Sequence, residues 1–191
     1  MRLNLTLPVP TSLNELYINE YSWNPKKKMR VPSGRRILSK EGEKCKEEII
    51  ELTKEQMKDQ EWNYDFTVDG YIYMDTVIYF SRKGRDDNNI YKLLCDSLEK
   101  LVYENDSRVL IRTQKILYDT VNPHIEVTLK PVDYKGIFKN EIHMNEFEDN
   151  CKTCKRYVRN CSILNKAKEG RIQEEIDEEF VCSKFSLKIN N

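Results

Sequence analysis

Residues 70–103 read GYIYMDTVIYFSRKGRDDNNIYKLLCDSLEKLVY, and this stretch decides the fold. From Gly70 to Phe80, β-branched and aromatic residues occupy both faces, which is typical of a central strand. From Asn89 to Tyr103, apolar residues recur at helical spacing and predict an amphipathic helix. The polar segment between these patterns matches neither of them. The chain is therefore expected to run from a strand through a polar loop into a helix.

The flanking sequence adds strands on both sides. Leucines alternate with polar residues from Arg2 to Leu7, and apolar residues alternate again from Ile125 to Leu129, which is the period of a half-buried strand. Residues 109–117 predict another strand. Because the connection between the last two strands is short, we expect them to form an antiparallel hairpin.

A second helix is expected after Ser39, whose side chain can cap it. Residues 22–38 predict an irregular basic loop or hairpin that turns at Pro32-Ser33-Gly34. The element order predicts an α/β (α+β) fold, a small mixed β-sheet packed with two main helices. We assign this domain to residues 1–135 and a small helical, metal-stabilised C-terminal module to residues 140–191.

The charge is unevenly distributed. The 32 basic and 32 acidic residues cancel, yet residues 26–46 contain nine basic residues against two acidic ones. Solvated charge runs are common, but this segment is also a candidate phosphate-binding surface. The N-terminal residues contain no apolar run typical of a signal peptide or membrane span, which predicts a cytosolic protein. The scattered glycines predict no nucleotide-binding loop.

Acidic residues gather around the expected helix. Asp86 and Asp87 lie where the strand gives way to the helix, and Asp106 follows the helix. Carboxylates brought together there could bind Mg²⁺, which prefers oxygen ligands and can activate a water for attack on a phosphate. Lys92 and Asp96 are four residues apart and share one helix face. The alternative interpretation is an ordinary helix cap and an ordinary surface ion pair.

This region resembles the RusA family of Holliday junction resolvases, or crossover junction endodeoxyribonucleases. The family signature is roughly D-x-D-N-x-x-K-x-x-x-D-x-L, followed by a D-D pair before a strand. Residues 86–98 read DDNNIYKLLCDSL, and Asn105-Asp106 follow. PVPTSLNELY at residues 8–17 looks like the proline-rich start of the family. Lys115 and the strand after it fit the closing part, so the resemblance covers roughly residues 1–130.

The resemblance implies a Mg²⁺-dependent endonuclease, encoded by a phage or prophage, that resolves branched DNA by paired symmetric nicks as a homodimer. It implies that the catalytic residues are Asp86, Asp87, Asn88, Lys92 and Asp106, with Asp86, Asn88 and Asp106 as the Mg²⁺ ligands. Asn88 and Asn105 stand where the family has aspartates. The expected DNA-binding residues are Lys26, Lys27, Lys28, Arg30, Arg35, Arg36 and Lys115.

Two other functions are compatible with the sequence. The asparagine at position 88 is also compatible with a branched-DNA-binding protein that has lost catalysis. In the second alternative, the chain is a phage interaction module in which the C-terminal region carries the function. Cleavage of a four-way junction distinguishes the first alternative from an active nuclease, and junction binding at low salt distinguishes the second.

Four cysteines are concentrated in the C-terminal region. Cys151, Cys154, Cys161 and Cys182 have the composition of a structural Zn²⁺ site, in which a C-x-x-C pair holds one edge of a tetrahedron. An iron–sulfur cluster and four reduced thiols are the alternatives. A helix is expected between the last two cysteines, and His143 is a further candidate ligand.

Overall fold

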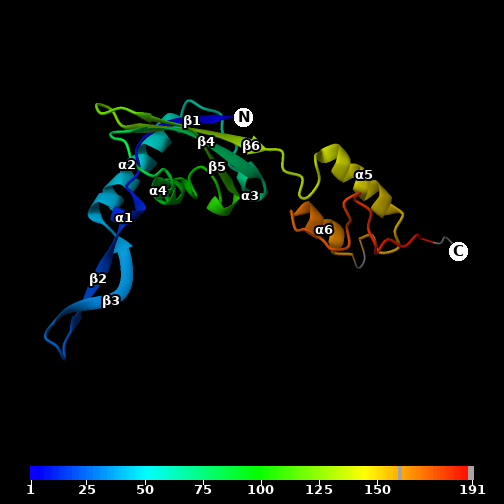
Figure 1. The fold of residues 1–191 in the computed structure, drawn as a ribbon, viewed down its shortest axis with the longest axis horizontal. Coiled ribbons are helices and arrows are strands. Elements are labelled where there is room, and N and C mark those ends of the chain that lie inside the picture. The colour runs from blue at the N-terminus through cyan, green and yellow to red at the C-terminus, as the bar shows by residue number, and fades with distance from the viewer. Residues whose placement is uncertain (159–160, 189–191) are drawn as a thin grey trace. The chain divides into compact units, whose positions relative to one another are not determined.

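The strand β4 (Tyr71–Phe80) lies inside the main sheet, as its apolar residues on both faces predict. β6 (His124–Val132) pairs antiparallel along one edge of β4, and β5 (Val109–Tyr118) pairs parallel along the other. β1 (Leu3–Pro8) pairs antiparallel with β6, which gives the order β1-β6-β4-β5 (Figure 1). The mixed sheet and the α+β class are therefore confirmed.

The computed structural model describes residues 1–158 and 161–188. Its contacts divide the chain into two compact units, the first from Met1 to Val132 and the second from Asp133 onwards. Over the described ranges, no helix is both long enough and apolar enough to cross a bilayer.

Two helices cover one face of the sheet. α2 (Lys40–Met57) begins after Ser39, whose hydroxyl accepts a hydrogen bond from the Gly42 amide at 3.0 Å, so the expected cap is confirmed. α4 (Asn88–Leu98) follows β4. The core combines one face of β4 and the leucines of β1 with the buried faces of both helices, including Ile49 and Leu94. This face of the sheet therefore supplies most of the burial that stabilises the unit.

The expected hairpin between the last two strands is wrong. β5 and β6 are separated by β4, which pairs with both. Because β4 is apolar on both faces, it takes the inner position, and its parallel partner β5 can be reached only through a crossover that contains α4. β5 is left at the end of the sheet.

α4 also ends earlier than the helical pattern predicts. It stops at Leu98, Glu99 is extended, and Lys100 has a positive φ of 63°. The apolar residues that continue the pattern instead fold back onto the core. The Trp62 indole donates a hydrogen bond to the Val102 carbonyl at 2.7 Å, and the Tyr103 hydroxyl donates one to the Cys95 carbonyl.

A two-stranded hairpin extends from the sheet and helices of the first unit (Figure 1). The one-turn helix α1 (Leu13–Leu16) leads into β2 (Tyr17–Asn24), which pairs antiparallel with β3 (Met29–Leu38). The expected turn at Pro32-Ser33-Gly34 is wrong: Pro32 is paired with Tyr21 inside β3, and residues 33–35 form an irregularity opposite Glu20. The chain turns instead at residues 25–28, where the Asn24 side chain accepts hydrogen bonds from the Lys26 and Lys27 amides.

Two short helices complete the first unit, α3 (Phe66–Asp69) before β4 and the 3-10 helix η1 (Asp106–Arg108) before β5. The second unit contains α5 (Glu141–Lys152) and α6 (Ile163–Lys168). Its small core includes Phe138, Phe147, Leu164 and Ala167. The expected helix between Cys161 and Cys182 is thus confined to α6, and residues 169–188 form turns and isolated bridges.

Candidate active site

The site is built at the N-terminal end of α4. The loop after β4 turns at Gly84, whose φ of 80° suits glycine. Asp86 follows, and its carboxylate accepts hydrogen bonds from the Asn88 amide at 3.0 Å and the Asn89 side chain at 3.3 Å. Asp86 thus holds the first turn of α4 while its carboxylate stays exposed. The ordinary cap expected under the alternative interpretation is absent, because the N-cap residue Asp87 makes no side-chain cap hydrogen bond. The bonds to Asp86, one residue earlier, leave oxygen lone pairs free for another ligand.

Asp87 is fixed from a different direction. Its carboxylate accepts a hydrogen bond of 2.6 Å from the Thr113 hydroxyl on β5. Thr113 lies 2.5 Å from the hydroxyl of Tyr91, which is itself 2.7 Å from the Thr76 hydroxyl on β4. Burial raises the pKa of Tyr91, so this phenol stays protonated and can donate to one of its neighbours. A chain of hydroxyl groups thus ties Asp87 to two strands.

Lys92 lies on the exposed face of α4, one turn after Asn88. Its ammonium donates a hydrogen bond of 2.7 Å to Asp96, and this bond raises the pKa of Lys92. The charge of Asp106 adds to the effect, and so does Tyr17 at the start of β2. The short helix α1, which precedes β2, packs against α4, so the base of the hairpin lies near the helix that carries Lys92.

Asp106 is the first residue of η1. The Asn105 side chain precedes it and accepts a hydrogen bond from the Ser107 amide at 2.9 Å, which caps this short helix. Asp106 acts electrostatically on Lys92 and on the buried Cys95 thiol. In the part of the chain that the structure describes, no hydrogen bond joins Asp106 to Asp86 or Asp87. Asp106 therefore belongs to η1, whereas the other two carboxylates lie at the start of α4.

The charges of this site are unbalanced. Among residues 1–158 and 161–188, Asp86, Asp87 and Asp106 form no ion pair with a lysine, an arginine or a histidine. In the same ranges, no three His, Cys, Asp or Glu side chains form a group that could hold a metal ion. The expected Mg²⁺ set contains only two carboxylates and the Asn88 amide. Mg²⁺ commonly uses one or two carboxylates and takes its other ligands from water and substrate phosphates, so this donor set fits it.

A comparison with models of known protein families shows which family the chain belongs to. The family model for the endodeoxyribonuclease RusA matches residues 20–130, which is more than half of the chain. The chain belongs to the RusA family. RusA proteins are endodeoxyribonucleases that resolve Holliday junctions, so the family acts on branched DNA. No curated protein matches the chain.

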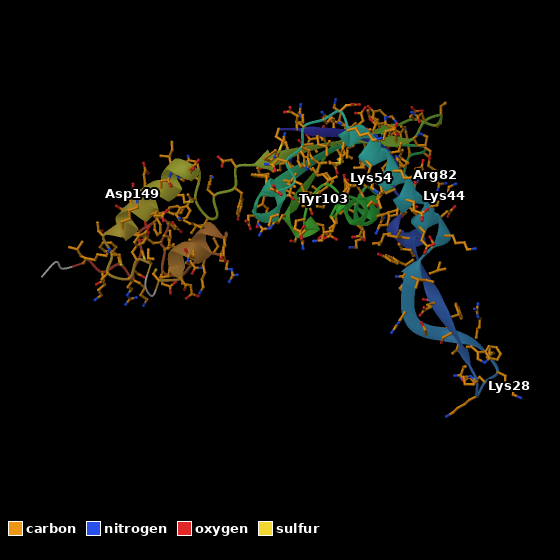
Figure 2. The ribbon with its side chains drawn as sticks, turned by 180° about the vertical axis from the view of Figure 1, so that it is seen from behind. Lys28, Lys44, Lys54, Arg82, Tyr103 and Asp149 are labelled. Atoms are coloured by element: carbon orange, nitrogen blue, oxygen red, sulfur yellow. The ribbon has the colours of Figure 1, made fainter. Side chains whose placement is uncertain are left out.

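The match begins inside β2 at residue 20 and includes the rest of the hairpin and the α4 site, but not the second unit. All six basic residues expected to bind DNA from residues 26–36 are exposed and lie in the hairpin or its turn. Lys115 is exposed on β5, paired in register with Val77. Lys28 marks the end of the hairpin in Figure 2. The RusA chain therefore carries its expected DNA-binding residues on two separate elements.

The four C-terminal cysteines lie around one cavity of about 180 Å³. Burial raises the pKa of Cys151 to about 11, and the negative charges that nearby cysteines would carry add to this shift. Burial also acts to raise the pKa of Cys154, but hydrogen bonds from backbone amides outweigh it and lower that pKa. One of these bonds comes from Ser186 at 3.4 Å. His143 instead packs its ring on Phe180.

Sequence reasoning missed three residues of the site. Thr113 could not be found, because its bond to Asp87 depends on the register between β4 and β5. Tyr91 was detectable as a polar-tipped residue one turn after Asp87. Tyr17 stands at the base of the hairpin, where the guanidinium of Arg36 donates to its carbonyl at 3.2 Å. Its electrostatic effect on the pKa of Lys92 depends on the packing of α1 against α4.

Proposed function

We propose that this RusA-family chain is a Mg²⁺-dependent endonuclease that resolves Holliday junctions by paired symmetric nicks as a homodimer. One observation carries the proposal: within the described residues, the carboxylates at the start of α4 and at η1 form no ion pair, and α4 carries Lys92 on its exposed face. Carboxylates that form no ion pair, in a member of a DNA-cutting family, are suited to bind a divalent cation.

Asp86, Asn88 and Asp106 would hold Mg²⁺. When bound, the metal would lower the pKa of a coordinated water and neutralise charge that develops on the phosphate. Asp87 would act as a positioning residue. The Thr113 hydroxyl donates a hydrogen bond of 2.6 Å to its carboxylate, and Asp87 lies between Asp86 and Asn88 in the chain. Asn88 contributes a neutral amide oxygen, so the site carries one negative charge fewer than the family pattern.

Lys92 would contact the scissile phosphate. Its raised pKa keeps the ammonium protonated, and its side chain is about half exposed, so a phosphate can reach it. On binding DNA, the ammonium would exchange part of its interaction with Asp96 for the phosphate oxygens. The six basic residues of the hairpin would bind phosphates farther along a DNA arm.

A homodimer would give the paired nicks. Two sites related by a two-fold axis match the symmetry of a four-way junction. The outer edge of β5 supports this proposal, because no described strand pairs with it and it exposes Ile116 and Tyr118. Sedimentation of the protein alone tests it: a species of twice the chain mass is expected, and a strict monomer that cuts both strands would contradict it.

The main test is cleavage of a labelled four-way junction against a linear duplex, with Mg²⁺ or a chelator. We expect Mg²⁺-dependent paired nicks near the branch point, and a rate loss of at least about 100-fold in Asp86→Asn and in Asp106→Asn. The control is Asp149→Asn, which removes an exposed carboxylate paired only with Lys152 (Figure 2). Full activity in both site variants would contradict the assignment.

Asn88 gives the second candidate function its support. If the wild-type protein binds the junction but does not cleave it, whichever divalent metal is added, the chain is a branched-DNA-binding protein. Asn88→Asp would then be expected to restore cleavage, since it adds the charge that the family pattern has at this position. Junction binding that is absent even at low salt would point to the C-terminal region as the functional part.

We also propose that the C-terminal cysteines bind a structural Zn²⁺ ion. The support is that Cys151, Cys154, Cys161 and Cys182 share one cavity and that backbone amides stabilise the Cys154 thiolate. Thiolates are the ligands that Zn²⁺ prefers in structural sites, and the small core of this unit would gain stability from the metal. Binding would have to draw the four sulfur atoms closer together.

Metal analysis of the purified full chain tests this proposal. We expect one Zn²⁺ per chain and loss of that ion in Cys154→Ser, whereas Cys45→Ser in α2 keeps it. A protein that carries iron with sulfide would favour the cluster alternative. A chain that binds neither metal, even when Zn²⁺ is supplied during refolding, would leave four reduced thiols.

A further inference from the structure

The hairpin formed by β2 and β3 carries an aromatic surface that phosphate binding does not explain. Trp23 and Tyr21 are 63% and 52% exposed, although large aromatic side chains usually bury most of their area. Within the described residues, neither ring packs on another ring or covers a cation. These two side chains therefore expose apolar area without an intramolecular partner.

The two rings lie on one face of the hairpin. Side chains alternate between the faces of a strand, so residues 21 and 23 point to the same side. Directly opposed residues share a face as well: Trp23 is paired with Arg30, and Tyr21 with Pro32. We name this surface, Tyr21, Trp23, Arg30 and Pro32, the aromatic face. It combines two flat rings with a guanidinium group.

The charge around the aromatic face identifies the partner. Residues 17–38 contain six basic residues and one acidic residue, a net charge of +5 in a chain whose total is zero. Glu20, the acidic one, is hydrogen-bonded by the Ser33 hydroxyl at 2.7 Å. None of the six basic side chains forms an ion pair inside the described structure. Such a surface repels basic partners and attracts a polyanion.

Stacking rings beside unpaired cations are the combination that binds single-stranded nucleic acid. Bases stack on aromatic side chains whatever their identity, while lysine and arginine follow the phosphates. In a continuous duplex the bases are already stacked, so the rings gain nothing there. At a branch point, base pairs at the exchange are more easily unstacked, and their flat faces can be reached.

We infer that the aromatic face stacks on bases exposed at the branch point and so supplies the preference for branched over linear DNA. The inference rests on the proposed function and deepens it, because it separates two tasks. The lysines at the turn hold phosphates in any DNA, whereas Trp23 and Tyr21 distinguish a junction from a duplex. The hairpin begins directly after α1, which packs against α4, so bases held on the hairpin would lead the adjoining backbone towards the α4 site.

The test measures binding by the full chain of a four-way junction and of a linear duplex of the same length, without added divalent metal. Trp23→Ala is expected to weaken junction binding by about 5- to 100-fold, the range for loss of one stacking ring, and duplex binding by less than about 2-fold. Trp23→Phe should retain most of the preference. The matched control is Tyr134→Ala, which removes a ring that is 40% exposed from the second unit and should change neither affinity.

A triple variant, with Lys26, Lys27 and Lys28 replaced by alanine, separates the two tasks. It should weaken binding to both DNAs alike and reduce the slope of log K against log salt by up to about 3. Trp23→Ala should leave that slope unchanged. A junction that carries 2-aminopurine at the branch point should lose fluorescence on binding the wild-type protein and lose less with Trp23→Ala.

Three outcomes count against the inference in different ways. If the wild-type protein binds no junction, the proposed function fails first and the inference fails with it. If it binds the junction and Trp23→Ala keeps the full preference over duplex, the inference alone is overturned. If Trp23→Ala dissociates a dimer but binds the junction normally, the aromatic face belongs to a second copy of the chain, which also overturns the inference.

Discussion

The hairpin and the sheet of the first unit use similar residues for opposite purposes. β4 alternates buried and half-buried side chains along its whole length, and its tyrosines and isoleucines pack within the unit. β2 also contains three aromatic residues and an isoleucine, and β3 contains a valine and an isoleucine, yet neither strand has a single buried residue. The same residue types thus serve a core in one region and an exposed surface in the other.

The comparison shows what stabilises each region. A strand inside the sheet is held by burial, at about 25 cal/mol for each square ångström of apolar surface removed from water. An isolated two-stranded hairpin is only marginally stable in water, because it has no such burial. Mutations in the sheet and helices should therefore act on folding, and mutations in the hairpin should act on binding. Four substitutions and one pH dependence test this division, and the substitutions follow in order of decreasing effect on stability.

The largest loss of stability is expected in the core. Leu94 on α4 is fully buried, and Leu94→Ala should lower the free energy of unfolding by about 2–5 kcal/mol, since it removes apolar contacts and leaves a cavity. Urea denaturation followed by circular dichroism measures the change. An effect below about 1 kcal/mol would show that α4 is not part of the cooperative core.

The second prediction concerns Asp75 on the other face of the sheet. Arg112 donates two hydrogen bonds to its carboxylate, at 2.6 and 2.8 Å, and Lys130 lies 2.9 Å away. Asp75→Asn leaves two cations without their counter-charge and should cost about 1–3 kcal/mol at pH 7. The loss should be found in urea denaturation of the variant, with Asp149→Asn as the unaffected control.

The same carboxylate predicts how stability depends on pH. The hydrogen bonds from Arg112 lower the pKa of Asp75, so its contribution is fully present above the unfolded value of about 3.9. The contribution is lost as pH falls through the lower folded pKa. Between pH 5 and pH 2, the wild-type protein should therefore lose more stability than Asp75→Asn. Parallel acid titration curves for the two proteins would contradict this assignment.

The third prediction concerns the edge of the sheet at β1. The amide side chain of Gln56 accepts from the Thr6 amide at 2.8 Å and donates to the Thr6 carbonyl at 2.9 Å, and Gln60 binds Asn4 in the same way. Gln56→Ala should cost about 1 kcal/mol, because it removes two hydrogen bonds. Glu55→Ala on the exposed face of α2 is the control. Equal stability of the two variants would mean that the hydrogen bonds from Gln56 to β1 do not contribute to the stability of the unit.

The smallest effect is expected in the hairpin. Met29→Ala removes a side chain that is 55% exposed, so the free energy of unfolding should change by no more than about 0.5 kcal/mol. Thermal melting compared with Leu94→Ala measures the contrast directly. A loss above about 2 kcal/mol would show that the hairpin packs against part of the protein in solution.

Local patterns explain how much of the fold could be predicted. The composition of β4, the cap at Ser39 and the periodicity of α4 are encoded within about 15 residues, and each appears in the structure. The partners of β5 and β6 are not encoded locally, since short connections favoured a hairpin and the central strand overrode it. The turn of the hairpin was misplaced because Pro32-Ser33-Gly34 carries the same composition as a turn.

The candidate site shows the same division. The spacing of Asp86, Lys92 and Asp106 predicts their roles by resemblance, and the charge of Asp106 contributes to the raised pKa of Lys92. The anchoring of Asp87 by Thr113 joins residues 26 positions apart through the sheet, so no local pattern could indicate it.

The pairing of β1 with β6 has a practical consequence. Leu3 is in register with Leu129, so the start of the chain and the exit of β6 lie at the same end of the sheet, whereas β1 leads towards the hairpin from its other end (Figure 1). A short linker could join Val132 to Met1 in a circular permutant of the first unit, opened at the exposed loop of residues 120–123. A dye attached at the N-terminus would likewise leave the hairpin free to meet DNA.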